Sequence, residues 1–482
     1  MLFSSLIFLF CFLPITLFVY YLFVGTRFRN AILLLASLIF FAWGGVSNSF
    51  ILIGSIIINF FFGKSIQKHR NTAKGRKILW WGVGINILIL FFFKYAGFML
   101  ENINSIKNLF DSPPYPALKI LLPVGISFYT FHAISYLVDI FRNKCDAQKN
   151  ILDLSLYITM FSQLIAGPII RYSDVWIQLK NRVHNTLKFQ EGIERFVIGL
   201  GKKVLIANCF AKVADEIFAF DFTSLSWYNA WLGIISYSLQ IYFDFAGYSD
   251  MAIGLGKMFG FDFMENFNFP YKAKSVRDFW HRWHISLSTF FRDYVYIPLG
   301  GNQVSNKRVY INLLIVFFLT GFWHGASWSF VIWGLFHGFF IVLERLFLKN
   351  VLNKIGPLSN IYLILVVIFS WVLFRIENID EALLYWSAMF NFTSNPLQLD
   401  LFCSFVTTEY IIVFVVAIVG SAGIFSFLNN FNEKIVLRGG ILTNIYALSF
   451  HTISAMFYIA LMILCTLYLN NANYNPFIYY RF

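Results

Sequence analysis

Charged residues are scarce in this sequence, and their scarcity decides its class. Asp, Glu, Lys and Arg make up 13% of the 482 residues, whereas a soluble globular protein carries about 25%. Hydrophobic residues make up 59%, and phenylalanine alone contributes 60 residues. The shortage excludes a string of soluble domains. It predicts an integral membrane protein, because about 20 apolar residues cross a bilayer as one helix.

Cysteine is also rare, and acidic residues are too few to balance the basic ones. The five cysteines are scattered with no C-x-x-C pair, which predicts neither a disulfide framework nor a zinc site. The net charge of +13 would indicate nucleic-acid binding in a soluble protein. Here Lys and Arg lie in short loops between apolar runs, as the positive-inside rule describes. We therefore expect membrane lipid as a partner, and neither nucleic acid nor a metal.

The loops between the first apolar runs carry a charge pattern that predicts the topology. The 64–77 loop holds six Lys or Arg residues and no acid, while the connections on either side are neutral or contain acids. This alternation places the loop in the cytoplasm and the N-terminus outside. The first apolar run lacks a basic start and a small-residue cleavage site, so we interpret it as a retained span.

The remaining apolar runs predict an all-α, multi-pass protein of the inner (cytoplasmic) cell membrane, with roughly ten to thirteen transmembrane or re-entrant helices. We expect one domain over 1–482. Within it, 1–170 form the N-terminal spans, 171–350 the central motif region with the active site, and 351–482 the C-terminal spans. No internal repeat is evident in the sequence, which weakens an inverted-repeat transporter as an interpretation.

The stretch "KSVRDFWHRWHISLSTFFRDYVYIPLGG", residues 274–301, combines aromatic and polar residues. Read as one helix ending before Pro298, it places Arg277, His281, His284, Ser288 and Arg292 on one face, at spacings of four, three, four and four. Trp280 and Trp283 fall on other faces. The pattern is typical of a helix at the membrane interface. His281 and His284 could also bind a metal, but no carboxylate or thiolate accompanies them at ligand spacing.

His324 lies within "GFWHGASW", residues 321–328, in a run that is too apolar to be a loop. Ionisable groups inside membranes are costly and usually functional, although a packed histidine bonded to a carbonyl is the alternative. Gly321 and Gly325 would let an acyl chain lie beside the ring. If 324–337 form one helix, His337 lies ~20 Å away and ~140° around the axis. His337 would then be structural.

Several other polar residues interrupt apolar runs. His132, Tyr136 and Asp139 fall on one face of a helix, and Asp244 and Asp250 lie in or near the membrane. Pairing with an Arg or Ser is favoured over a direct catalytic role for each, because such pairing lets an acid remain there. Asp244 is kept as a candidate substrate-binding residue.

Four stretches together resemble the membrane-bound O-acyltransferases. They are "SQLIAGPIIRY", "YFDFAGYSDMAIGLGKMFGF", "DFWHRWHISLSTFFRDYVYIPLGG" and "TGFWHGASWSFVIWGLFHG". The similarity covers residues 1 to 380 and is greatest to the branch of the alginate O-acetyltransferase membrane subunit. One departure is His281, where Arg is more usual in the family.

The resemblance implies a ring of helices around a central funnel. It implies that His324 is the family's invariant histidine and His284 its second one. The donor would be cytoplasmic acetyl-CoA or a similar acetyl thioester, with no tightly bound cofactor. Extracytoplasmic partner proteins would pass the acetyl group to a polysaccharide such as alginate.

The corresponding chemical hypothesis makes His324 a general base on an acceptor hydroxyl, with His284 orienting the donor or sharing the proton. Arg282 and Arg292 would contact coenzyme A phosphates, and Trp280, Trp283 and Trp323 would wall the tunnel. Ser288 and Asp244 complete the candidate substrate-binding set. Direct transfer is favoured over a covalent acyl-enzyme. The alternatives are a transporter or polysaccharide-export channel that uses the membrane histidines and acids as a relay, and a structural scaffold.

Overall fold

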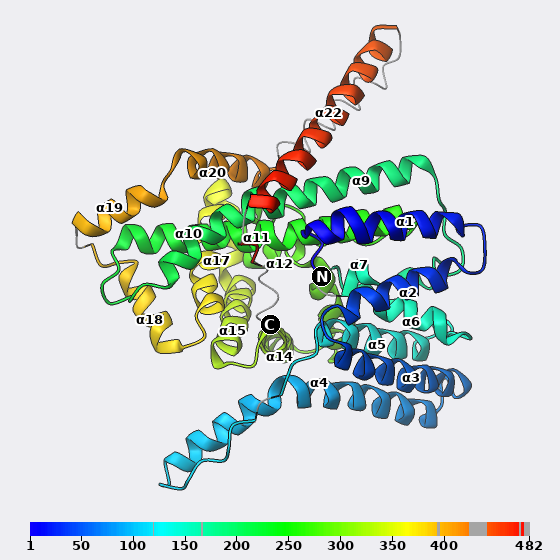
Figure 1. The fold of residues 1–482 in the computed structure, drawn as a ribbon. Helices are drawn as coiled ribbons and strands as arrows, with labels where there is room; N and C mark the ends of the chain where they lie inside the picture. The colour runs from blue at the N-terminus through cyan, green and yellow to red at the C-terminus, as the bar shows by residue number, and fades with distance from the viewer. Residues whose placement is uncertain (119, 165–166, 393–395, 424–440, 472–473, 477–482) are drawn as a thin grey trace.

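The computed structural model describes residues 1–482 apart from 119, 165–166, 393–395, 424–440, 472–473 and 477–482. Within that part of the chain every regular element is a helix (Figure 1), which confirms the all-α, polytopic architecture expected from the sequence. Helices suit such a chain because lipid offers no hydrogen bonds, so each segment must satisfy its own main-chain polar groups.

The N-terminal helices pack as a group at one side of the molecule (Figure 1). They are η1 Phe8–Phe12, α1 Leu13–Leu22, α2 Arg29–Ala42, α3 Val46–Lys68, α4 Ala73–Asn108, α5 Ile126–Phe141, α6 Ile151–Thr159 and α7 Phe161–Leu164. The side chain of Thr72 accepts a hydrogen bond from the main-chain nitrogen of Gly75 and so begins α4. Both α3 and α4 pack against α5.

The centre of the molecule is built around α11, which is buried along almost its whole length. The elements here are α8 Tyr172–Val175, α9 Thr186–Gly201, η2 Lys202–Ala207, α10 Asn208–Phe218 and α11 Trp227–Met258. Glycines allow α9 and α11 to cross closely, since a Cβ on Gly199 would meet the main-chain nitrogen of Met251 at 2.7 Å. Small residues at such crossings are typical of membrane helices.

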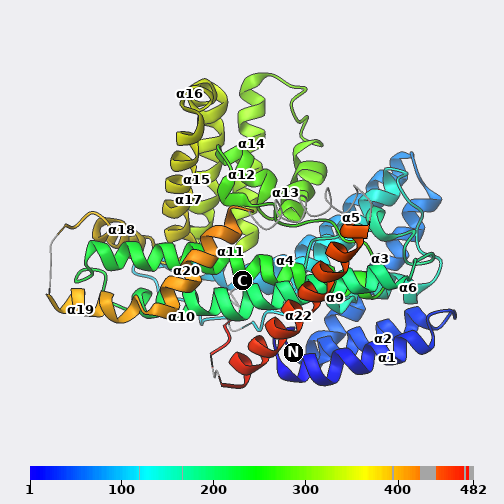
Figure 2. The same ribbon diagram turned by 90° about the horizontal axis from the view of Figure 1, so that it is seen from above.

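In the motif region α14, α15 and α17 stand together (Figure 2), and α17 packs against α11. Its elements are η3 Pro270–Lys272, α12 Val276–Arg282, α13 Ile285–Phe291, η4 Arg292–Tyr296, α14 Asn306–His324, α15 Trp328–Leu343, η5 Glu344–Leu348, α16 Lys349–Ile355, η6 Gly356–Leu358 and α17 Ser359–Arg375. The helical run ends before Pro298, as expected.

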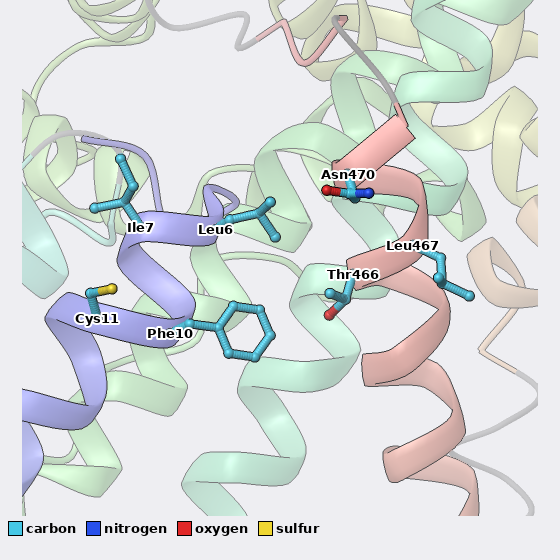
Figure 3. Close-up of a pocket in the computed structure, with 7 residues that line it drawn as sticks. All are labelled: Leu6, Ile7, Phe10, Cys11, Thr466, Leu467 and Asn470. Atoms are coloured by element: carbon cyan, nitrogen blue, oxygen red, sulfur yellow. The ribbon is translucent and has the colours of Figure 1, made fainter.

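The C-terminal helices lie at the periphery, and α22 leaves the body of the molecule (Figure 1). They are α18 Ile379–Ala388, α19 Pro396–Phe405, α20 Thr408–Ser421 and α22 Ile441–Asn471. A mostly apolar hollow of about 490 Å³ lies between the first and last helices (Figure 3). Its lining includes Phe10 and Leu467 and no histidine.

Among the described residues, four helical stretches are long and apolar enough to cross a bilayer: Asn48–Lys68, Ala73–Asn108, Trp328–Arg375 and Ser449–Asn471. The bent pair α19 and α20 would add a fifth. Other apolar segments are shorter, such as the 14-residue α2, which spans about 21 Å against the roughly 30 Å of a bilayer core. The ten to thirteen expected segments therefore include short helices that cannot each cross the bilayer in full.

Candidate active site

The helix expected over 274–301 is broken at His284. α12 ends at Arg282, α13 begins at Ile285, and His284 takes a left-handed conformation with φ +44°. The predicted face running from Arg277 to Arg292 is therefore wrong, because a positive φ turns the chain and ends the helical repeat. His281, which precedes the break, is exposed, whereas His284 at the break is fully buried.

A loop residue, Asn266, holds the His284 ring. Nδ1 of His284 lies 3.1 Å from Oδ1 of Asn266, which also accepts hydrogen bonds from the main-chain nitrogen and the hydroxyl of Ser286. Because Oδ1 can only accept, Nδ1 must carry the proton, and in a neutral ring Nε2 is then an acceptor. Nε2 is buried and has no hydrogen-bond partner among the described residues.

The second histidine, His324, is the last residue of α14, and α15 begins at Trp328. The expectation of one helix over 324–337 is therefore wrong, and so is the separation calculated from it. α14 and α15 instead pack against each other. The ring centroids of His324 and His337 each lie 5.1 Å from that of Trp333.

The glycines around His324 serve helix packing. A Cβ on Gly321 would collide with the carbonyl oxygen of Phe330 and meet Cα of Gly334 at 3.1 Å, while one on Gly325 would collide with the Phe330 ring. Both glycines are thus already covered by protein. The close approach that these glycines permit is used by α15, and an acyl chain beside the His324 ring stays a prediction.

The two histidines meet at one indole. The Trp323 ring centroid lies 4.8 Å from His324 and 6.1 Å from His284. All three side chains are buried. Phe245 closes the far side of His284, at 4.6 Å between centroids. Two helix ends that are 40 residues apart in the sequence therefore present their imidazoles to the same place.

Trp280 and Trp283 contribute to the aromatic packing around the motif helices. Trp280 contacts Trp333 and His337, with centroids at 5.8 and 5.3 Å. Trp283 lies 5.0 Å from Trp371. The predicted tryptophans are thus grouped around the motif helices, and Trp323 lies beside both His284 and His324.

The other predicted substrate-binding residues hold contacts elsewhere. Arg282 pairs with Asp278 at 2.9 Å, and Arg292 pairs with Asp293 at 2.7 Å. The Ser288 hydroxyl is 3.5 Å from the carbonyl oxygen of Trp283.

Asp244 and Asp250 both pair with basic residues. Asp244 forms a fully buried ion pair with Lys203 at 2.8 Å. Asp250 pairs with Arg195 and Lys202, each at 2.6 Å. Pairing with an Arg or Ser was expected for both acids. Arg195 confirms it for Asp250, whereas the partner of Asp244 is a lysine.

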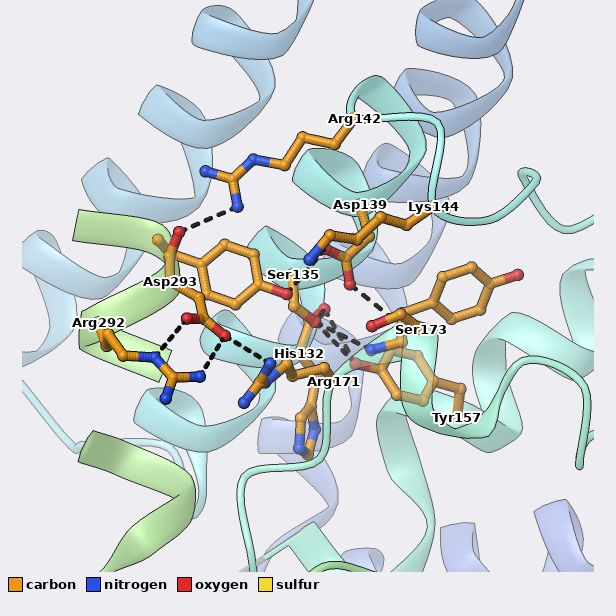
Figure 4. Close-up of polar contacts among 12 residues, drawn as sticks. His132, Ser135, Asp139, Arg142, Lys144, Tyr157, Arg171, Ser173, Arg292 and Asp293 are labelled. Atoms are coloured by element: carbon orange, nitrogen blue, oxygen red, sulfur yellow. Dashed lines mark hydrogen bonds and ion pairs between the residues drawn. The ribbon is translucent and has the colours of Figure 1, made fainter. Parts of the chain in front are cut away.

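A second polar cluster joins α5, the chain before α8, and η4 (Figure 4). Asp293 accepts from Arg171 at 2.6 Å and from Arg292, and its carbonyl oxygen accepts from Arg142. Burial acts to raise the pKa of the Asp293 carboxyl, but the hydrogen bond from Arg292 and the charge of Arg171 outweigh it and hold that pKa below its ordinary value.

Asp139 belongs to the same cluster, where it accepts from the Tyr294 hydroxyl at 2.9 Å (Figure 4). Lys144 lies 3.9 Å from this carboxylate. The structural interpretation of Asp139 is thus supported by its contacts. The described residues hold no group of three or more His, Cys, Asp or Glu side chains placed to bind a metal.

Two residues near His324 escaped the sequence analysis. Lys94 of α4 donates to the carbonyl oxygens of Trp323 at 2.5 Å and His324 at 3.1 Å. Its neighbour Tyr95 donates to the carbonyl oxygen of Phe322 at 2.7 Å. A signal for Lys94 was present, because it is the sole charged residue between positions 78 and 100. Asn266 gave no comparable signal, since its role depends on the folded loop.

The family comparison agrees with this geometry. Residues 142–385, which contain both histidines, match the membrane-bound O-acyltransferase (MBOAT) family. The chain therefore belongs to this family and is an integral membrane O-acyltransferase.

The chain is also similar to individual proteins of known name. The chain is 44% identical over 394 residues to the probable alginate O-acetylase AlgI of Pseudomonas aeruginosa, covering 81% of this chain and 75% of that protein. It is 39% identical over 420 residues to the peptidoglycan O-acetyltransferase of Helicobacter pylori, with 80% and 78% covered. Identity falls to 28% over 252 residues for the teichoic acid D-alanyltransferase of Bacillus subtilis, with 49% and 62% covered.

Proposed function

We propose that this protein transfers an acetyl group from a cytoplasmic acetyl thioester, acetyl-CoA, toward hydroxyls of an extracytoplasmic polysaccharide. The observation that carries the proposal is the meeting of His284 and His324 at Trp323, from two separate helix ends. Buried imidazoles within an apolar shell suit proton transfer away from bulk water. Two relatives are named as an alginate O-acetylase and a peptidoglycan O-acetyltransferase. These names support acetyl as the transferred group and a polysaccharide as the acceptor.

In the proposed reaction, His324 removes the proton from an acceptor hydroxyl as its oxygen attacks the thioester carbonyl carbon. The carbon–sulfur bond then breaks, and the leaving thiolate takes up the proton that His324 removed, which returns the imidazole to its neutral form. A neutral imidazole suits the first step because one ring nitrogen can accept a proton. Such base catalysis contributes about 10²–10⁴-fold. No acyl-enzyme is required.

His284 has a distinct part in this proposal. Its Nδ1 is held as a donor by Asn266, so the buried Nε2 can accept a hydrogen bond. We assign Nε2 the role of orienting a hydroxyl or amide hydrogen of a substrate beside Trp323. The expected central funnel would bring donor and acceptor to this point from opposite sides. Trp280 and Trp283 then belong to its wall, with Arg282, Arg292, Ser288 and Asp244 as outer candidates for substrate contact.

The test uses purified protein in liposomes, with labelled acetyl-CoA on one side and an oligosaccharide acceptor on the other. His324→Ala is expected to lose about 10²–10⁴-fold in transfer rate. His281→Ala is the matched control, because that histidine is exposed and bonds only to the carbonyl oxygen of Arg277. Transfer by His324→Ala at the wild-type rate would refute the role given to His324.

The sidedness and the partner need a separate measurement. We propose an inner-membrane location with the N-terminus outside, and an extracytoplasmic acetyltransferase partner that receives the group. Labelling of single cysteines placed at the N-terminus and in the 64–77 loop of intact cells distinguishes the two orientations. The proposed orientation requires modification at the N-terminus only. Mass analysis of envelope polysaccharides from a deletion strain identifies the acceptor by its lost acetyl groups.

A further inference from the structure

Lys94 is an unusual residue for its position. It lies within α4, and residues 78–100 contain no other charged side chain. A lysine inside a membrane helix is costly unless a partner satisfies it. None of the ion pairs found among the described residues includes Lys94. The usual explanation for such a lysine, an acidic partner, is therefore absent from that part of the chain.

The partners of Lys94 are main-chain carbonyls at the end of one helix. Its ammonium group donates to the carbonyl oxygens of Trp323 and His324, and it lies 5.9 Å from the centroid of the Trp323 ring. The last carbonyls of a helix lack partners within the helix and carry partial negative charge. An ammonium group satisfies them and complements that charge.

Tyr95 extends the contact by one residue. Its hydroxyl donates to the carbonyl oxygen of Phe322, and its ring stacks on the Phe322 ring at 4.1 Å and 11°. Lys94 and Tyr95 together therefore hold three consecutive carbonyls, from Phe322 to His324. We call this arrangement the α4 clamp.

We propose that Lys94 is the positioning residue for His324: the α4 clamp fixes the end of α14 and thereby sets where the imidazole stands relative to Trp323 and His284. This inference rests on the proposed function of His324. The clamp is needed because the helix ends at this residue, and the following Gly325 is extended at φ −160°. A helix end without such partners frays, and a displacement of about 1 Å in a catalytic group can cost about 10²-fold in rate.

The main test is Lys94→Met, which keeps an unbranched apolar chain and removes the ammonium group. We expect kcat to fall by about 10²-fold with little change in KM, because positioning affects the transition state more than substrate binding. Hydrogen exchange should become faster in the peptide covering 321–328. Lys107→Met is the matched control, since Lys107 lies on the same helix and its ammonium group lies 3.7 Å from the centroid of the Tyr115 ring; its kcat and exchange should match wild type.

Two further variants separate positioning from loss of fold. Tyr95→Phe keeps the stacked ring and removes one neutral hydrogen bond, so kcat should fall by about tenfold at most. In the double variant Lys94→Met with His324→Ala, the lysine change should cause little further loss, because it acts through a ring that is already gone. An equal loss in both backgrounds would overturn the positioning role.

The outcomes also separate the clamp from the proposed function. Wild-type kcat and wild-type exchange in Lys94→Met would overturn the clamp even if His324→Ala is inactive. Faster exchange at 321–328 together with full activity of His324→Ala would keep the clamp as a structural feature and overturn the base role of His324.

Discussion

The two helix ends that carry the histidines are built in opposite ways. At His284 the side chain is held, through Nδ1 and Asn266, while the backbone adopts a left-handed conformation. At His324 the main chain is held, through Lys94, and the residue keeps its helical conformation. The difference indicates that the first ring has a fixed tautomer and orientation, whereas the second has a fixed point of attachment. In the proposed reaction, His284 orients the substrate and therefore needs a fixed tautomer and ring orientation. His324 transfers a proton and needs a fixed main-chain position.

The largest expected effect separates chemistry from backbone geometry at His284. Asn tolerates a positive φ better than most residues, so His284→Asn should fold while it loses the imidazole. We expect transfer to fall by at least about 10²-fold, with thermal unfolding in detergent close to that of wild type. Full activity of this variant would show that the break at 284 serves shape alone.

Asn266→Ala tests the side-chain support of the first histidine. The change leaves Nδ1 of His284 and the hydroxyl of Ser286 buried without their acceptor. We expect transfer to fall by about 10²-fold, because the ring loses its orientation. We also expect about 1–3 kcal/mol less stability from the unpaired groups. Asn268→Ala is the control on the same loop, and an equal loss there would contradict a specific role for Asn266.

Gly321→Ala tests the packing behind the second histidine. The added methyl would press on α15, so overpacking should cost about 1–3 kcal/mol and lower the unfolding temperature. Gly54→Ala, in α3, is the matched helical glycine with nothing within 4 Å of a new Cβ. It should gain about 0.5–1 kcal/mol from its higher helix propensity. Equal shifts in the two variants would rule out the close α14–α15 contact.

The smallest effect concerns the Asp293 cluster, which follows the first break. Because its folded pKa is lowered, the Asp293 carboxyl contributes stability that is fully present above its unfolded pKa of about 3.9, and that is lost as the pH falls through the folded value. Asp293→Asn should therefore cost on the order of 1 kcal/mol at pH 7 and progressively less below about pH 4. Asp278→Asn, at a partly exposed i,i+4 pair, should change stability little at either pH. A constant difference across that range would contradict the lowered pKa.

The sequence predicted the class of protein and the two histidines more successfully than the local geometry around them. The low charge and long apolar runs were enough for an all-helical membrane protein, and the motifs were enough for the family. The break at His284 could not be predicted from periodicity, because "RWHISLS" contains neither Gly nor Pro and the turn depends on contacts with Asn266. The break after His324 was missed because its flanks are apolar, although Gly325 stands at the boundary.

The α4 clamp has a consequence for how small the catalytic unit can be. The segment that matches the family begins at residue 142, yet the lysine that grips the His324 carbonyl comes from residue 94. A shortened version trimmed to the matched segment would retain both imidazoles and the asparagine beside the first. It would leave the end of α14 without its anchor. In this proposal, the N-terminal segment that carries Lys94 is needed for catalysis as well as for anchoring in the membrane.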